Sequence, residues 1–194
     1  NFSLDSAVVA SGGLADSVSS IEFSPDGRIF YTEQYKGIVR ILKADGTAQT
    51  EPFVQVPVAD WLGLDWGLTG MALDPGFETN HYVYLFYTAL IGSESYQEAD
   101  GTTREHPIGK PTVVRYTEQN GAATEETVIS DAFPQTDVRH PGYNANGELH
   151  FGPDGLLYAS VGGYDLFSEE PDVIRDPTSA IGKLLRMNPD GSAS

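Results

Sequence analysis

Apolar and polar residues alternate in short runs along this chain, with the two-residue period that is typical of β-strands. In residues 28–32, Ile29 and Tyr31 fall on one side of the predicted strand. Residues 82–87 carry aromatic and β-branched side chains at both alternating sets of positions, which indicates a strand covered on both faces. The period of an amphipathic helix is nearly absent. The pattern therefore predicts an all-β protein.

Three segments of the chain repeat the same order of elements: a strand, a tight turn of Pro, Asp and Gly, a strand, a loop and another strand. The segments are residues 20–46, 70–116 and 148–191. Proline fixes a negative φ and the residues after it tolerate a left-handed backbone, so these turns reverse the chain quickly. We expect a further strand at 52–56 and at 127–130. Repeated units of antiparallel strands, four to a unit, are typical of β-propeller blades.

The repeat is long because its loops are enlarged. Arg40, Arg115 and Arg186 occupy matching positions 75 and 71 residues apart (115 − 40 and 186 − 115). Common propeller repeats span roughly 40 to 50 residues. Large loops on a regular scaffold are where binding and catalytic residues concentrate. The longest predicted loops are residues 60–69, 91–110, 131–146 and 162–179.

The number of units is too small to close a propeller, which needs about four to eight blades. We expect blades at about 14–60, 61–131 and 146–194, the last incomplete, within a single propeller domain. A remaining part of the propeller, either a separate chain or a missing segment, is therefore an expected partner.

The charge balance and the absence of cysteine limit the possible chemistry. With 28 acidic and 11 basic residues, the formal net charge is −17. Such a chain repels polyanions, so nucleic acids and anionic membrane surfaces are disfavoured as partners. The lack of cysteine excludes disulfides, thiolate zinc sites and cysteine nucleophiles. The longest apolar run, at 82–92, is far shorter than the roughly 20 residues that span a membrane.

The run 66–77, Trp-Gly-Leu-Thr-Gly-Met-Ala-Leu-Asp-Pro-Gly-Phe, resembles the second-blade signature of the glucose/sorbosone dehydrogenase family, the soluble quinoprotein sugar dehydrogenases. Residues 147–155 and 176–191 resemble later parts of the same pattern. The resemblance begins near Leu14 and keeps the family's order along nearly the whole chain. It implies a six-bladed propeller of which residues 1–194 are the N-terminal half.

Enzymes of this family oxidise the C1 hydroxyl of an aldose by passing hydride to pyrroloquinoline quinone (PQQ), which calcium and arginines hold, while a histidine acts as the general base. The resemblance therefore implies PQQ and calcium as cofactors and a sugar or other small polyol as ligand. It also implies a secreted, periplasmic or cell-surface location. Most cofactor-binding residues of the family are expected outside this chain, so we assign no metal ligand within it.

The position of the catalytic base departs from the family pattern. The family histidine opens a His-x-Gly-Gly-x-Leu motif, and counting back from Leu149 places Asn144 there. Asparagine cannot accept a proton at neutral pH. The preceding position, often a carboxylate that orients the base, is Tyr143. His140, upstream on the same loop, is the alternative base, and its ordinary interpretation is a solvated loop histidine.

The resemblance also implies positions that contact the substrate. Asp65 and Trp66 fall where family members place a polar substrate contact, and a carboxylate beside an aromatic ring is a common way to hold a sugar. The alternative is that Trp61 and Trp66 only pack against the blade. The Gly-Asp that follows the third-blade hairpin in the family reads Gly-Gly here, with Asp165 shortly after it. With Tyr143, Asp165 completes the candidate substrate-binding set.

Two further features have ordinary structural interpretations. His150 alternates with Leu149 on a predicted strand, and we expect it to be packed rather than to act as a ligand. The acidic loop from Asp165 to Asp172 contains oxygen ligands that calcium prefers, but it lacks the fixed spacing of a calcium loop. In so acidic a chain we expect this loop to be a solvated surface.

Two functions remain open, and they differ in whether the chain is an enzyme. The first is a PQQ-dependent aldose or sorbosone dehydrogenase, with His140 or an altered arrangement around Asn144 supplying the base. The second is a catalytically inactive extracellular propeller that serves as a carbohydrate-binding, surface or assembly module. The fold alone does not decide between them.

Overall fold

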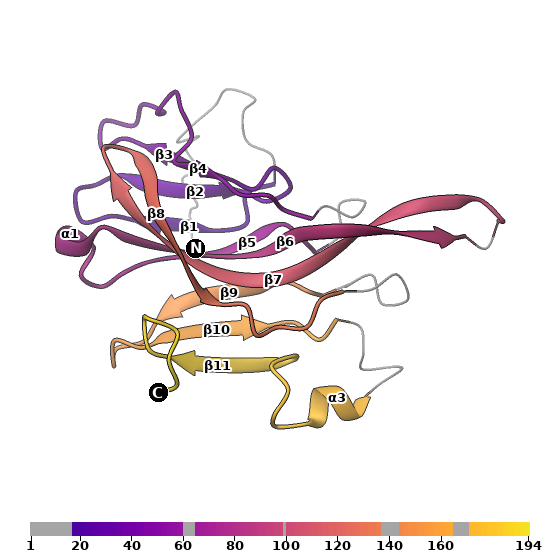
Figure 1. Ribbon diagram of the computed structural model, residues 1–194. Helices are drawn as coiled ribbons and strands as arrows, with labels where there is room; N and C mark the ends of the chain where they lie inside the picture. The colour runs from indigo at the N-terminus through magenta and orange to yellow at the C-terminus, as the bar shows by residue number, and fades with distance from the viewer. Residues whose placement is uncertain (1–16, 60–64, 99, 137–143, 165–170) are drawn as a thin grey trace, which may run out of the picture.

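The computed structural model describes residues 17–59, 65–98, 100–136, 144–164 and 171–194. They form three antiparallel sheets packed face to face, and in each sheet the strands follow one another in chain order (Figure 1). The first two sheets have four strands and the third has three, which confirms the predicted all-β fold of propeller blades. Only two short helices are described, α1 (Phe77–Asn80) and α3 (Pro171–Arg175). The strands are β1 (Ile21–Phe23), β2 (Ile29–Glu33), β3 (Ile38–Leu42), β4 (Val54–Gln55), β5 (Leu68–Leu73), β6 (Tyr82–Gln97), β7 (Thr103–Gln119), β8 (Ala122–Ser130), β9 (Gly147–Phe151), β10 (Leu157–Val161) and β11 (Lys183–Met187).

The Pro-Asp-Gly turns have the geometry that the sequence predicts. Gly27 and Gly155 close matching turns with φ of 86° and 75°, a left-handed backbone that glycine adopts without strain. Their amide groups donate to the carbonyl oxygens of Ser24 and Gly152 at 2.9 and 3.0 Å. These turns join β1 to β2 and β9 to β10, so the same local chemistry starts the first and third sheets.

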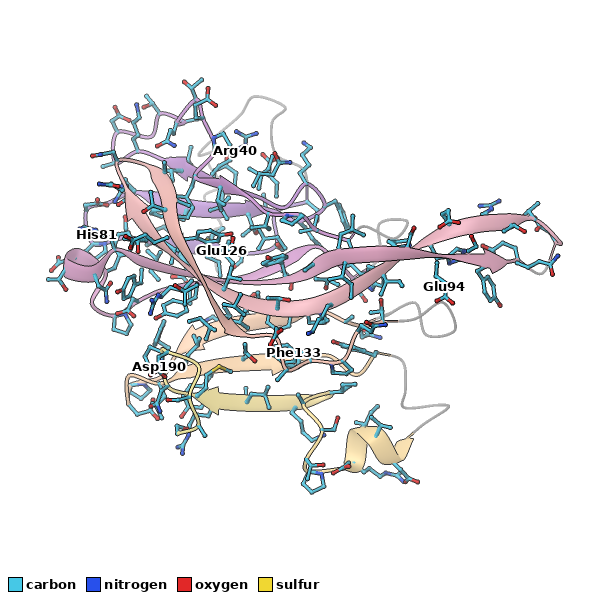
Figure 2. The ribbon with its side chains drawn as sticks, viewed as in Figure 1. Arg40, His81, Glu94, Glu126, Phe133 and Asp190 are labelled. Carbon is cyan, nitrogen blue, oxygen red and sulfur yellow. The ribbon has the colours of Figure 1, made fainter. Side chains whose placement is uncertain are left out.

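The segment 91–110, expected to be a long loop, is instead a two-stranded extension of β6 and β7. The strands stay paired from a bulge near Leu90 to the pair Gln97 and Thr103, and Glu94 lies far out on this hairpin (Figure 2). The hydroxyl groups of Ser93 and Ser95 both donate to Glu105 on the opposite strand. The expectation was wrong because the residues are polar, and cross-strand hydrogen bonds rather than apolar alternation hold the ribbon together.

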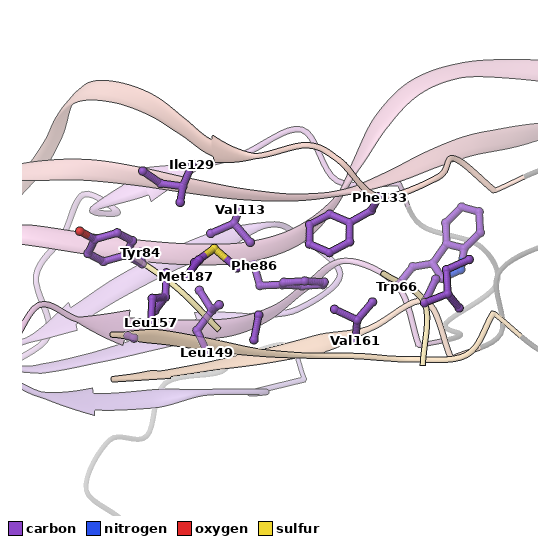
Figure 3. Packing of buried hydrophobic residues seen from close by; sticks show 14 of the residues in the cluster. Trp66, Tyr84, Phe86, Val113, Ile129, Phe133, Leu149, Leu157, Val161 and Met187 are labelled. Atoms are coloured by element: carbon purple, nitrogen blue, oxygen red, sulfur yellow. The ribbon is translucent and has the colours of Figure 1, made fainter. Parts of the chain in front are cut away.

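Two apolar cores lie between the sheets, and β6 contributes to both. Val83 and Leu85 face the first sheet, whereas Tyr84 and Phe86 face the third, and all of these side chains are fully buried. Figure 3 shows Tyr84 and Phe86 packed near Leu149 of β9. The aromatic and β-branched residues at both sets of positions in 82–87 therefore mark a central sheet that is covered on both faces, as predicted.

The outward faces of the first and third sheets expose apolar side chains. On β1, Ile21 and Phe23 are 52% and 67% exposed, and on β11 Leu184 is 72% exposed. Ile21 and Phe23 alternate with Glu22, which pairs with the buried Phe30, so they point away from the second sheet. Within the described residues, no further sheet packs on either face. Among the same residues, no helix has the length and apolar character of a membrane span.

Candidate functional site

A polar pocket lies at one end of the sheets, which we call the top face. It has a volume of about 330 Å³ and forms where the β2–β3 connection and the end of β10 meet the segments that enter β1, β5 and β9. The described parts of the enlarged loops reach this same end, because Gly162 donates to Asn146 and Gly109 to Thr136. The residues that line this top-face pocket are Ser19, Gln34, Asp65, Thr69, Asn146, Gly147, Glu148 and Ser160.

The pocket exists because β5 and β9 approach each other unusually closely. A Cβ atom on Gly70 would lie 2.9 Å from the Cα atom of Glu148, so only glycine permits this spacing. The hydroxyl of Thr69 donates to the carbonyl oxygen of Gly147 at 2.8 Å and accepts from the Gly147 amide at 3.2 Å. The side chains at the start of β5 and β9 are therefore held beside one another.

Glu148 is the most constrained carboxylate of the pocket. Its Oε1 atom accepts hydrogen bonds from the amides of Leu149 and Met71, at 3.1 and 3.3 Å, and from the Ser20 hydroxyl at 3.4 Å. Burial raises the pKa of Glu148 above its ordinary value, and these hydrogen bonds and a nearby histidine only partly offset the effect. Burial likewise raises the pKa of Glu22, which Glu148 raises further. Strands β1 and β9 thus carry two carboxylates, those of Glu22 and Glu148, whose charge is incompletely compensated.

The stability of the fold should depend on this charge. Because the pKa of Glu148 is raised on folding, its contribution to stability is present below the ordinary glutamate pKa of 4.5 and is lost as the pH rises through the folded-state value. The substitution Glu148→Gln keeps an acceptor oxygen and removes the charge. We expect it to raise the melting temperature at pH 7 by up to about 2–4 °C, the shift that 1 kcal/mol produces at this size. The gain should vanish at pH 4, as calorimetry at both pH values will show.

Glu118 provides a control, because its pKa is shifted in the opposite direction to that of Glu148. Burial would raise the pKa of Glu118, but the hydrogen bonds from Arg28 at 3.0 Å and from the Gly121 amide at 2.6 Å outweigh it and lower the pKa. Its contribution is therefore present above the ordinary glutamate pKa and is lost as the pH falls through the folded-state value. Glu118→Gln should lower the melting temperature at pH 7. Equal shifts for the two variants would contradict this assignment.

Asp65 and Trp66, which the sequence predicts to act together, lie in different environments. Asp65 is exposed and lines the pocket. Trp66 is only 1% exposed and belongs to the core between the second and third sheets. Its ring lies close to Gly109, which favours the interpretation of Trp66 as a packing residue, while Trp61 lies outside the described residues. The Trp66 carbonyl oxygen instead accepts from the Gln34 side chain at 2.9 Å and so positions a lining residue.

Asn144 lies next to the pocket, in the turn that precedes β9. It is exposed and has a left-handed backbone, with φ of 58°. Its carbonyl oxygen packs against Gly162, which in turn donates to the carbonyl oxygen of Asn146 at 2.9 Å. Asn146, two residues further along the chain, lines the pocket, so the candidate base position Asn144 lies beside the pocket. The other candidates, His140, Tyr143 and Asp165, lie outside the described residues.

A methyl group at position 162 should disturb this turn. A Cβ atom on Gly162 would lie 1.7 Å from the carbonyl oxygen of Asn144, so the turn must move. We expect Gly162→Ala to destabilise the protein by about 1–3 kcal/mol, as overpacking generally does, and to weaken ligand binding at the pocket. The neighbouring Gly163→Ala is a matched control because its Cβ atom would meet only Ile174, at 3.4 Å. Denaturant unfolding of both variants tests the difference, and equal losses would refute it.

Sequence patterns did not identify most of the lining residues. Gln34, Asn146, Glu148 and Ser160 are ordinary polar residues at strand ends, and only the packing of three sheets brings them to one cavity. One signal was available, because Gln34 and Ser160 both lie within one residue of the end of the second strand of a repeat unit.

The remaining sequence expectations concern His150 and the acidic loop. His150 is exposed on β9, so the expectation that it is packed was wrong. The reason is that it alternates with Leu149, and only the Leu149 side of β9 faces the second sheet. Of the acidic loop, Asp172 is described and exposed. Among the residues that the structure describes, no group of three or more His, Asp or Glu side chains is arranged to hold a metal ion.

Comparison with known proteins gives sequence relatives whose chains are much longer. Hedgehog-interacting protein of Mus musculus is 26% identical over 185 residues, which cover 92% of this chain and 25% of that protein. The Homo sapiens protein of the same name is 25% identical over the same length. The chain therefore spans about a quarter of the curated relatives that it matches.

Solved structures with the same fold are sugar dehydrogenases. An oxidoreductase (glucose dehydrogenase) from Thermus thermophilus superposes with a TM-score of 0.73 and 26% identity, over 94% of this chain and 47% of that one. The PQQ-bound form of aldose sugar dehydrogenase from Streptomyces coelicolor gives a TM-score of 0.71 and 23% identity, over 95% of this chain and 48% of that one.

The family itself follows from a match along nearly the whole chain. The family model described as Glucose / Sorbosone dehydrogenase matches residues 15–194, which include all three sheets and every described residue that lines the top-face pocket. This chain belongs to the glucose/sorbosone dehydrogenase family.

Proposed function

We propose that the top-face pocket binds a sugar or a related small polyol. The observation that carries this proposal is the lining, in which hydroxyl, amide and carboxylate groups from all three sheets converge on one cavity. Ser19, Gln34 and Asn146 can both donate and accept hydrogen bonds, as the hydroxyl groups of a sugar require. The pocket volume of about 330 Å³ suits a ligand of this size.

The described lining does not fit PQQ by itself. PQQ is a tricarboxylate, whereas the described lining contributes two carboxylates, Asp65 and Glu148, and no lysine or arginine. Cations that hold PQQ, including calcium, would have to come from outside this described lining. The family supports such a cofactor, and the Streptomyces coelicolor relative is PQQ-bound, so we retain PQQ-dependent oxidation of a C1 hydroxyl as the candidate reaction of the whole protein.

A second candidate is a catalytically inactive extracellular propeller that serves as a carbohydrate-binding, surface or assembly module. Two observations favour it. Asn144 stands at the position of the expected base and cannot take a proton, and the curated relatives are named Hedgehog-interacting proteins rather than dehydrogenases. A carbohydrate-binding module shares the proposed sugar-binding pocket with the dehydrogenase and differs from it in lacking a hydride acceptor and a base.

The rest of the propeller is part of the same proposal. The exposed Ile21, Phe23 and Leu184 lie on the outward faces of the first and third sheets, where further blades would cover them. The solved relatives are about twice as long as the matched region. We infer that residues 1–194 are the N-terminal half of a single six-bladed domain, and that the protein is secreted, periplasmic or at the cell surface.

The decisive experiment uses the complete protein that contains this chain. Sugar binding is measured by calorimetry, and dye reduction by aldoses is followed after addition of calcium and PQQ. Turnover that His140→Ala abolishes supports the dehydrogenase with that base, and turnover that survives this substitution excludes only His140. Sugar binding without PQQ binding establishes the inactive module. Failure to bind any sugar or polyol overturns the proposed function.

A further inference from the structure

The described side chains of the top-face pocket carry charge of one sign. Among the lining residues that the structure describes, the two ionisable ones, Asp65 and Glu148, are both acidic, and the other side chains are neutral. From this cavity we infer that the site selects sugars by charge: it prefers amino sugars, whose ammonium group pairs with Asp65 or Glu148, and it rejects sugar acids and sugar phosphates. The inference rests on the proposed sugar-binding function and names the substrate class.

Glu148 is positioned to receive a cation. The three hydrogen bonds to its carboxylate all go to Oε1, so Oε2 accepts none of them. The amide of Glu148 itself donates to the Ser160 hydroxyl at 3.1 Å, which fixes the backbone of the residue at the pocket wall. A carboxylate held in this way loses little conformational freedom when a ligand pairs with it.

The charge of Glu148 is incompletely balanced by the surrounding protein. Burial raises the pKa of its carboxyl group, and the neighbouring Glu22 adds a like charge. The partners on Oε1 are neutral amides and a hydroxyl, and His150 on the same strand offsets only part of the effect. A ligand ammonium would supply the missing positive charge in a partly buried site, where ionic hydrogen bonds are stronger than at an open surface.

Asp65 adds a second negative charge at the mouth of the pocket. It is exposed and lies just before Gly67, whose φ of 96° and close approach to the Gln34 carbonyl oxygen anchor the turn. The formal net charge of −17 adds a field of the same sign around the site. An anionic sugar would therefore meet like charge during approach and again in the bound position, whereas an ammonium group is attracted in both.

The test compares three probes of similar size with the complete protein at pH 7. Calorimetry should show that D-glucosamine binds about tenfold more tightly than D-glucose, the gain expected when a neutral hydrogen bond becomes ionic. D-glucuronate should bind more weakly than D-glucose. The preference for glucosamine should shrink as salt is raised from low to high concentration, because salt screens the charges.

Charge-neutral variants assign the preference to these residues. In Asp65→Asn with Glu148→Gln, the ratio of the glucosamine affinity to the glucose affinity should fall from about ten to about one. Glu78→Gln removes one exposed charge on helix α1, which does not line the pocket, and should leave the preference unchanged. Glucose binding without a preference for glucosamine over glucuronate overturns this inference alone. Failure of all three probes to bind overturns the proposed function as well.

Discussion

Replacement of Trp66 by alanine is expected to lower the free energy of unfolding by about 3–5 kcal/mol, the usual range for a large aromatic residue in a core. Trp66 is 1% exposed and is among the largest fully buried side chains of the described residues. It packs in the core between the second and third sheets, beside Gly109 of β7. The loss combines the transfer free energy of the indole ring with the cavity that it leaves. Denaturant unfolding followed by circular dichroism measures it.

A second substitution separates packing from ligand contact. Trp66→Leu restores part of the apolar volume but has no ring on which a sugar could stack. Because the ring of Trp66 is buried, we expect this variant to be less stable than the wild type and to bind sugar with unchanged affinity. A large loss of sugar affinity in a variant that is folded at the assay temperature would instead show that the ring takes part in binding.

Arg40→Ala is expected to destabilise the protein by about 3–5 kcal/mol, because it leaves a buried carboxylate without its main partner. Glu33 is 0% exposed at the end of β2, and its Oε1 atom lies 2.6 Å from Nε of Arg40. After the substitution, the remaining cation is Lys36, whose Nζ atom lies 3.5 Å from Oε2 and whose side chain is 48% exposed. Such a contact compensates the buried charge poorly. Unfolding of the purified variant in urea tests this value.

An exposed ion pair serves as the matched control. Nζ of Lys110 lies 3.2 Å from Asp131, with side chains 31% and 66% exposed, so Lys110→Ala should change stability by less than about 1 kcal/mol. Adding Glu33→Gln to Arg40→Ala should recover much of the lost stability, since it removes the unpaired charge. Equal losses for the Arg40 and Lys110 variants would show that burial does not strengthen the first pair.

The structure places two neighbouring candidate site residues in different surroundings. Asp65 lines the pocket and Trp66 does not, although both belong to the same short motif. Adjacent residues leave a loop in different directions, and which of them meets the core depends on the sheet that packs there. The position of Asn144 beside the pocket was consistent with the family motif. An asparagine side chain at this position cannot accept a proton at neutral pH.

Local chemistry was sufficient to predict the repeated sheets. The alternation in 82–87 and the turns that end in Gly27 and Gly155 act over a few residues, so strands and reversals could be located without knowledge of their partners. The same reasoning failed at 91–110, because polar strands that hold each other through cross-strand hydrogen bonds have no apolar period.

The tertiary structure alone decided where the polar groups converge. Gln34, Asp65, Glu148 and Ser160 are far apart along the chain, and they share a pocket because glycine lets β5 approach β9 and because each sheet ends at the same face. Burial, unlike alternation, is a property of all neighbours together. It therefore determined that the ring of Trp66 is enclosed, that the charge of the partly buried Glu148 is incompletely compensated, and that the described lining of the pocket is acidic.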